Sequence, residues 1–117
     1  MTTADHGDAS AARRALAAQH CKPGAPRLAA SELDAHLRAL PGWTLEGNAI
    51  AKTFRFGDYA ETIAFVNAVA AIAQREDHHP DLAVHYDHCS VTWSTHSAGG
   101  VTLNDIVCAA QVDELRP

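Results

Sequence analysis

The stretch DYAETIAFVNAVAAIAQREDHHP, residues 58–80, decides the fold of this 117-residue chain. Asp58 can cap the first backbone amides of a helix, and Glu61 stands three residues later, as in a capping box. Apolar residues then recur at helical spacing, namely Tyr59, Ile63, Val66, Val69, Ala70 and Ala73. Pro80 cannot continue a helix. The pattern therefore predicts one long helix from residue 58 to about residue 77.

Alternating patterns typical of strands lie on both sides of this helix. Before it, residues 43–46 and 50–56 flank Gly47-Asn48, which predicts a hairpin. After it, residues 82–86 and 91–96 alternate around a turn at 87–88. Two hairpins separated by one helix predict an α+β fold, in which a four-stranded antiparallel sheet has helices packed on one face.

Two further helices complete the expected order helix-β-β-helix-β-β-helix. The first starts at Ser31 as its cap, carries Leu33, Leu37 and Leu40 at helical spacing, and ends before Pro41-Gly42. The last one opens on Thr102-Leu103-Asn104-Asp105, which matches a capping box.

The N-terminal part of the chain has a different character. Residues 1–12 are small and polar, which predicts disorder, and residues 11–20 can form only a short helix before Pro23, Gly24 and Pro26. We therefore expect a flexible N-terminal extension over residues 1–26 and a single domain over residues 27–117. The extension lacks the apolar core of a signal peptide, so we expect a cytoplasmic protein.

Composition excludes several functions. The net charge of −5 argues against a nucleic-acid-binding surface, and no apolar stretch reaches the length of a membrane span. Cys21, Cys89 and Cys108 are odd in number and widely spaced, which argues against a disulfide framework or a Cys-rich zinc site. Reduced thiols are the simplest interpretation.

Three histidines form the candidate site. His78 and His79 lie against the helix-stopping Pro80, and His96 ends the last predicted strand. Imidazole titrates near neutrality, so such a group suits proton transfer, metal binding or pH sensing. The simpler interpretations are that His78 and His79 only close a helix and that His96 is an exposed strand residue. Three histidines can hold zinc, but adjacent histidines rarely converge on one ion, and no carboxylate or thiol completes a ligand set. We therefore predict no metal.

Together these motifs resemble the pterin-4a-carbinolamine dehydratase family. The resemblance runs from about Leu40 to Leu115. It is carried by Leu40-Pro41-Gly42-Trp43, Phe54-Arg55-Phe56, Asp58-Tyr59, Asp77-His78-His79-Pro80, Tyr86, Ser94-Thr95-His96 and Asp105. His-His-Pro followed at this distance by Ser-Thr-His is the most specific part.

The resemblance implies a function and a set of site residues. Such proteins dehydrate 4a-hydroxytetrahydropterin, which aromatic amino acid hydroxylases release, to quinonoid dihydropterin, with the pterin as substrate and no further cofactor. His78 and His96 correspond to the acid–base positions, and His79 to a substrate-contacting or auxiliary one. The residues expected along the polar edge of the pterin are Asp77, Ser94, Thr95 and Ser97. A homodimer or homotetramer and a functional link to a hydroxylase are expected as well.

Two positions have an uncertain supporting role in this comparison. Family members commonly carry an acid one helical turn before the first histidine, where this chain has Gln74. A carboxylate there would raise the pKa of His78, whereas an amide stabilises the imidazolium less. Asp105 matches a recurrent family position, but a carboxylate in a capping box needs no catalytic role.

A non-catalytic dimerisation or binding module of the same fold is the alternative, because some relatives act as dimerisation partners of other proteins. Retention of all three histidines favours the enzyme.

Overall fold

Four strands form one antiparallel sheet in the order β1-β2-β4-β3. The computed structural model describes residues 2–116, and the side chains of residues 9–116. Its elements are α1 (Thr2–Ala17), α2 (Ala30–Arg38), β1 (Thr44–Glu46), β2 (Ala49–Arg55), α3 (Tyr59–Glu76), β3 (Asp81–Val84), β4 (His88–Trp93), the 3-10 helix η1 (His96–Ala98) and α4 (Leu103–Glu114). The two hairpins, β1–β2 and β3–β4, meet where β2 pairs with β4, from Ile50 opposite Trp93 to Arg55 opposite His88.

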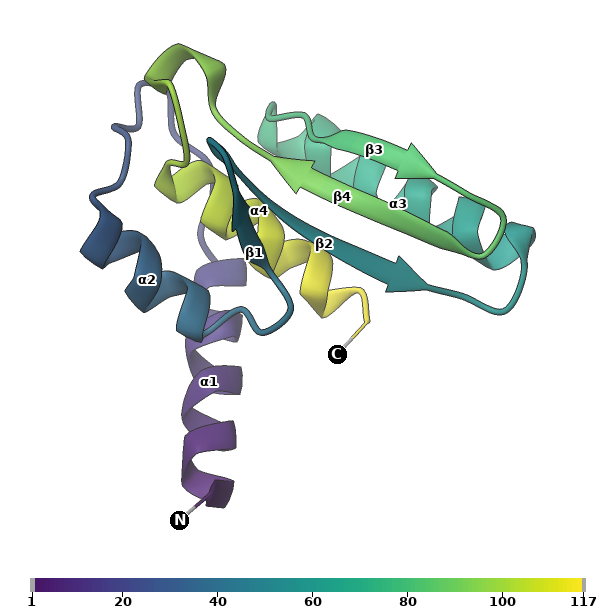
Figure 1. The fold of residues 1–117 in the computed structure, drawn as a ribbon, viewed down its shortest axis with the longest axis horizontal. Coiled ribbons are helices and arrows are strands. Elements are labelled where there is room, and N and C mark those ends of the chain that lie inside the picture. Colours follow the sequence, from purple (N-terminus) through teal and green to yellow (C-terminus); the bar gives the residue numbers. More distant parts are fainter. Residues whose placement is uncertain (1, 117) are drawn as a thin grey trace.

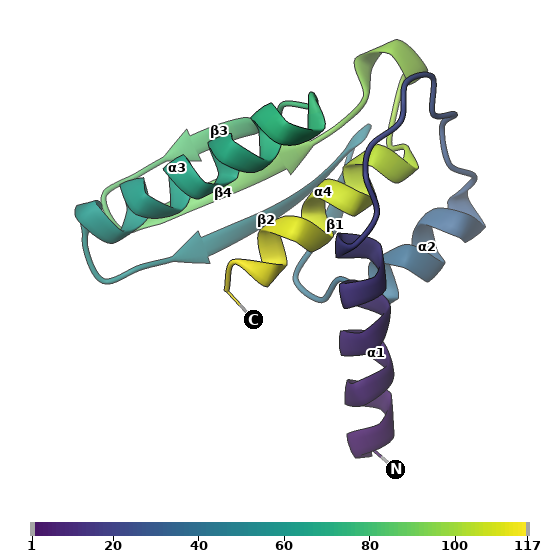
Figure 2. The same ribbon diagram turned by 180° about the vertical axis from the view of Figure 1, so that it is seen from behind.

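The helices α3 and α4 cover one face of this sheet (Figures 1 and 2). On β4 every second side chain, Cys89, Val91 and Trp93, is buried toward these helices, as period-two alternation requires. The opposite face of the sheet is polar, and there the hydroxyls of Thr53 and Ser90 lie 2.7 Å apart across β2 and β4. The predicted α+β fold with helices on one face is confirmed.

The last helix, α4, is the centre of the core. Residues 105–113 of α4 are all buried. The sheet lies on one side of α4, and α1 crosses it on another side, with its far end projecting away from the sheet (Figure 2). This arrangement places polar groups such as Asp105 and Gln111 in the interior.

The structure of α1 differs from the expected disorder of residues 1–12, because the helix already begins at Thr2. The last turns of α1 pack against the rest of the domain. Leu16 belongs to the hydrophobic core, and Arg13 forms an ion pair with Glu114 at 3.0 Å. Composition alone did not reveal these contacts, because they depend on a partner about one hundred residues away in the sequence. The division of the chain at residue 26 stays a prediction.

Element ends show three smaller differences. Ser31 lies inside the first turn of α2, whose cap is Ala29, and Glu32 accepts a hydrogen bond from the Ala29 amide at 2.9 Å. Strand β3 ends at Val84, because the His85 amide already bonds to the His88 carbonyl in the turn. Strand β4 ends at Trp93, so Thr95 and His96 belong to the following loop. The predicted caps of α3 and α4, Asp58 and Thr102, are confirmed.

Candidate active site

His78 is placed by the way α3 ends. The helix stops at Glu76, and Asp77 adopts the left-handed conformation with φ 52°. Aspartate tolerates this conformation better than most residues. The amides of Asp77 and His78 both donate to the Ala73 carbonyl, so the chain turns tightly off the helix. His78 thereby leaves the helical spacing and reaches α4.

A buried carboxylate receives the His78 ring. His78 Nε2–H donates to Asp105 Oδ1 at 2.6 Å, and the Asp105 side chain is completely buried, whereas that of His78 remains 15% exposed. The imidazole also stacks on the Trp93 indole, with ring centroids 5.4 Å apart. The hydrogen bond to Asp105 raises the pKa of His78 above its ordinary value, and burial opposes it only partly. The site therefore favours the imidazolium form.

Asp105 serves two structures at once. Its Oδ2 accepts the Thr102 amide at 2.9 Å, which is the predicted capping box. The same oxygen accepts the Thr95 hydroxyl at 2.8 Å, and the Thr102 hydroxyl donates to Thr95 at 2.9 Å. The other oxygen, Oδ1, is left for His78. A capping role therefore does not exclude a role at the histidine, because a carboxylate has two oxygens.

His96 lies in different surroundings. It begins η1 after the backbone of Thr95 has bonded to that of Gly100, and its side chain is exposed. It lines a cavity of about 360 Å³ together with Ser94, Thr95 and residues 48–49 of the β1–β2 hairpin. The predicted residues Ser94, Thr95 and His96 thus share one cavity, whereas the exposed Ser97 does not line it.

His78 lines a second cavity, of about 240 Å³. Asp77 and Glu76 contribute to it from the end of α3, Asn104 from α4, and residues 21–23 from the N-terminal segment. The structure therefore does not bring His78 and His96 into one cavity. What joins them is Asp105, which binds His78 with one oxygen and Thr95 of the His96 cavity with the other.

Besides Ser97, two further exposed residues of the predicted site lie apart from both cavities. The side chains of His79 and Gln74 are exposed and line neither cavity. Within the part of the chain that the structure describes, Gln74 makes no hydrogen bond to His78. Gln74 would lie one helical turn below the His78 ring if α3 continued, but the helix ends at Glu76 and the chain turns at Asp77. Asp105, and not residue 74, supplies the carboxylate to His78.

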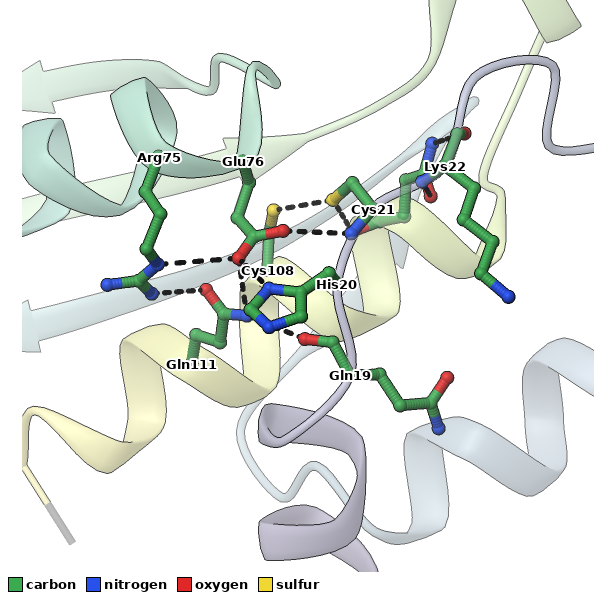
Figure 3. A network of polar contacts seen from close by, with 9 residues as sticks. Gln19, His20, Cys21, Lys22, Arg75, Glu76, Cys108 and Gln111 are labelled. Carbon is green, nitrogen blue, oxygen red and sulfur yellow. Dashed lines mark hydrogen bonds and ion pairs between the residues drawn. The ribbon is translucent and has the colours of Figure 1, made fainter.

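Glu76 is the residue that sequence reasoning missed (Figure 3). Its side chain is only 2% exposed and fixes the N-terminal segment, accepting the Cys21 amide on Oε1 at 2.8 Å and His20 Nδ1–H on Oε2 at 2.8 Å. Gln111 donates to the same Oε2 at 3.1 Å and to the Gln19 carbonyl at 3.0 Å. Glu76 thus builds a wall of the His78 cavity. The available signal was its position seven residues after Val69, because residues seven apart lie on the same face of a helix and Val69 is buried.

The network around Glu76 also sets its charge. Burial by itself would raise the pKa of Glu76, but hydrogen bonds from Cys21, His20, Gln111 and Arg75 outweigh burial and lower this pKa to about 2. The carboxylate is therefore ionised throughout the neutral range.

Residues 2–116 contain neither a metal-binding group nor a membrane-spanning helix. Among residues 2–116, no group of three or more His, Cys, Asp or Glu side chains is arranged to hold a metal ion. The predicted absence of a metal stays a prediction. None of the described helices is both long and apolar enough to span a membrane.

The sequence profile described as Pterin 4 alpha carbinolamine dehydratase matches residues 26–115, most of the chain. This chain belongs to the pterin-4a-carbinolamine dehydratase family. The resemblance seen in the histidine motifs is thereby confirmed.

Relatives in this dehydratase family cover nearly the whole length of the chain. Two bacterial proteins carry the name "Putative pterin-4-alpha-carbinolamine dehydratase". The one from Nitrosospira multiformis is 50% identical over 86% of this chain and 91% of its own length. The one from Xanthomonas campestris pv. campestris (strain 8004) is 52% identical over 82% and 86%.

Solved structures confirm the dehydratase fold. A transcriptional coactivator/pterin dehydratase from Brucella melitensis superposes with a TM-score of 0.74 at 38% identity, over 78% of this chain and 99% of that one. A pterin dehydratase-like protein described as a RuBisCO assembly factor in the alpha-carboxysome gives a TM-score of 0.52 at 28% identity, over 62% and 84%.

Proposed function

We propose that this protein dehydrates 4a-hydroxytetrahydropterin to quinonoid dihydropterin and water. Membership of the dehydratase family supports the substrate class. The observation that carries the proposal is the contact between His78 and the buried Asp105, which orients the imidazole at the wall of a cavity and raises its pKa.

The reaction needs only proton transfer. One proton must reach the departing 4a-hydroxyl group, which leaves as water, and one proton must leave N5 of the pterin. His78 gives its Nε2–H to Asp105, so the Nδ1–H of the imidazolium is the donor that remains, and Nδ1 has no partner among the residues that the structure describes. Asp105 stabilises the imidazolium until the proton is transferred.

The second proton is assigned to His96, whose exposed ring can accept it and pass it to water. Thr95, the residue before His96, donates to Asp105, which also binds His78. We propose auxiliary contact with the pterin for His79, and polar contacts for Asp77, Ser94, Thr95 and Ser97. This chemistry uses no metal and no cofactor besides the pterin.

The wider setting is proposed on the same basis. We propose a homo-oligomer, a dimer or a tetramer, that acts in the cytoplasm beside an aromatic amino acid hydroxylase and recycles its pterin. These proposals follow from the family and not from a contact in the structure.

The direct experiment follows the disappearance of 4a-hydroxytetrahydropterin with the purified full chain. We expect acceleration that persists in a strong chelator and falls sharply in Asp105→Asn, which keeps the size of the side chain but removes its charge. Glu46→Gln, on exposed β1, is the matched control. No acceleration by the folded protein contradicts the proposal, as does loss of activity in chelator that zinc restores.

A non-catalytic role is the second candidate, since the solved relatives include a coactivator/dehydratase and a dehydratase-like assembly factor. A protein that only binds partners has no need of a buried carboxylate directed at a half-buried histidine. The same assay separates the two roles, because a pure binding module leaves the spontaneous rate unchanged.

A further inference from the structure

Two cysteine thiols meet beside the His78 cavity. Cys21 Sγ, in the segment between α1 and α2, lies 3.4 Å from Cys108 Sγ on α4 (Figure 3). Cys21 is half-buried and lines the cavity, whereas Cys108 is completely buried behind it. The two residues are 87 positions apart in the sequence, so only the fold brings them together.

The surroundings give the two thiols different chemistry. The hydrogen bond with Cys108 lowers the pKa of Cys21; burial and the carboxylates of Glu76 and Asp105 oppose this shift, and the charge of His78 assists it. The same contact, together with burial, raises the pKa of Cys108. Cys21 therefore ionises first and faces the solvent-connected cavity, while Cys108 keeps its proton. A thiol of lowered pKa that lines a cavity, with a protonated thiol next to it, is the usual arrangement of a reactive cysteine and its resolving partner.

We propose that Cys21 and Cys108 form a redox-sensitive pair that hydrogen peroxide converts into an intramolecular disulfide. This modification site goes beyond the proposed dehydratase function and does not depend on it.

The chemistry proceeds in two balanced steps. The Cys21 thiolate attacks one peroxide oxygen, the O–O bond breaks, and the hydroxide that leaves takes up a proton, so Cys21 becomes a sulfenic acid. Cys108 sulfur then attacks the Cys21 sulfur, the S–O bond breaks, and the hydroxyl leaves as water with the Cys108 proton. In sum, two thiols and one hydrogen peroxide give one disulfide and two waters.

The geometry requires a small movement. A disulfide has its sulfurs about 2.05 Å apart, so the two Sγ atoms must approach by about 1.4 Å. Cys21 lies in a segment without helix or strand, which can supply this movement, while the buried α4 stays in place. The bond would tie the N-terminal wall of the His78 cavity covalently to α4.

Cys89 provides an internal control. It is completely buried on β4, burial raises its pKa, and its only hydrogen bond among the described residues goes to the Ser90 carbonyl at 3.9 Å. It has neither a thiol partner nor a place on either site cavity. Peroxide should leave it reduced under conditions that oxidise the pair.

The test is treatment of the full chain with hydrogen peroxide, alkylation of the remaining thiols and mass spectrometry. No Lys or Arg lies between Arg75 and Arg116, so trypsin leaves Cys89 and Cys108 on one peptide. Chymotrypsin, which cleaves after Trp93, separates them. We expect a loss of two hydrogens and a peptide crosslinked through Cys21 and Cys108, reversed by dithiothreitol.

Variants and melting complete the test. Cys21→Ala and Cys108→Ala should each abolish the crosslink, and Cys89→Ala should retain it. Because the disulfide closes a long loop, the oxidised protein should melt several degrees higher than the reduced one. Crosslinks through Cys89, disulfide-linked dimers as the main product, or oxidation of Cys21 to sulfinic acid without a crosslink would each overturn the proposal.

Discussion

His78 and His96 have the same side chain, but one ring is mostly buried and hydrogen-bonded and the other is exposed. His78 is mostly buried, stacked on Trp93 and bonded to Asp105, which fixes its orientation and raises its pKa. His96 is exposed at the start of η1 and makes no side-chain hydrogen bond among the described residues.

The difference suggests a division of labour. A held and charged ring is suited to deliver a proton to a departing hydroxyl, whereas an accessible ring is suited to take a proton and exchange it with water. Between them stands one carboxylate, Asp105, whose two oxygens bind His78 and Thr95. The comparison predicts similar losses of rate but unequal losses of stability when either ring is removed.

The largest effect is expected from removing either ring. His78→Ala and His96→Ala should each lower the dehydration rate by about 10²- to 10⁴-fold, the usual contribution of a positioned acid or base. If the two rings serve one reaction step, the double variant should lose much less than the product of the single losses. Steady-state rates of the four proteins measure this.

The same variants separate the two surroundings. His78→Ala leaves Asp105 buried without its partner and should lower the melting temperature, whereas His96→Ala should leave it nearly unchanged. Near-normal rates in both single variants, with folding intact, would show that the site assignment is wrong.

A smaller effect is expected at Glu76, which supports only the His78 side. Its folded pKa of about 2 lies below the ordinary value of 4.5, so the stabilisation from its ionised form is present above pH 4.5 and is lost as the pH falls from there toward 2. Glu76→Gln should lower the free energy of unfolding at pH 7 by about 2 to 3 kcal/mol. Denaturant unfolding at pH 7, 5 and 3 measures the difference, which should shrink with falling pH.

Glu46→Gln is again the control, since Glu46 is exposed on β1 and should show no such pH dependence. If Glu76→Gln loses little free energy of unfolding at pH 7, or loses the same amount down to pH 3, the hydrogen bonds of ionised Glu76 do not stabilise the fold.

The smallest effect is expected at Gln74. Because its side chain is exposed and Asp105 already supplies the carboxylate to His78, Gln74→Glu should change the rate by less than about twofold and leave the pH–rate profile in place. An upward move of the alkaline limb by half a unit or more would show that residue 74 does reach His78 in the working enzyme.

Local patterns allowed most of the fold to be predicted. Periodicity and capping depend on residues close together in the sequence. They were enough to predict the long α3, both hairpins and the caps at Asp58 and Thr102. The alternation of apolar and polar residues continues past Trp93, where β4 ends. Thr95 instead pairs with Gly100 in the following loop, and this pairing cannot be predicted from alternation alone.

The site was predicted less completely, because its decisive contacts join distant residues. The sequence identified His78 and Asp105 separately, but their contact spans 27 positions, and that of Glu76 with the Cys21 amide spans 55. It also placed Gln74 one helical turn before His78 as a supporting residue, whereas the helix ends at Glu76 and Asp105 makes the contact with His78.

The central claim, that Asp105 holds His78 as an imidazolium, is tested most directly by an NMR titration of the histidine rings, with His78→Ala to assign the signal. The account predicts a His78 pKa above 6.5 in the unaltered protein and a clear fall in Asp105→Asn. Because the folded pKa is raised, the stability that the pair supplies should be full below pH 6.5 and lost as the pH rises through the folded pKa. A His78 pKa at or below 6.5, unchanged in Asp105→Asn, would contradict the account.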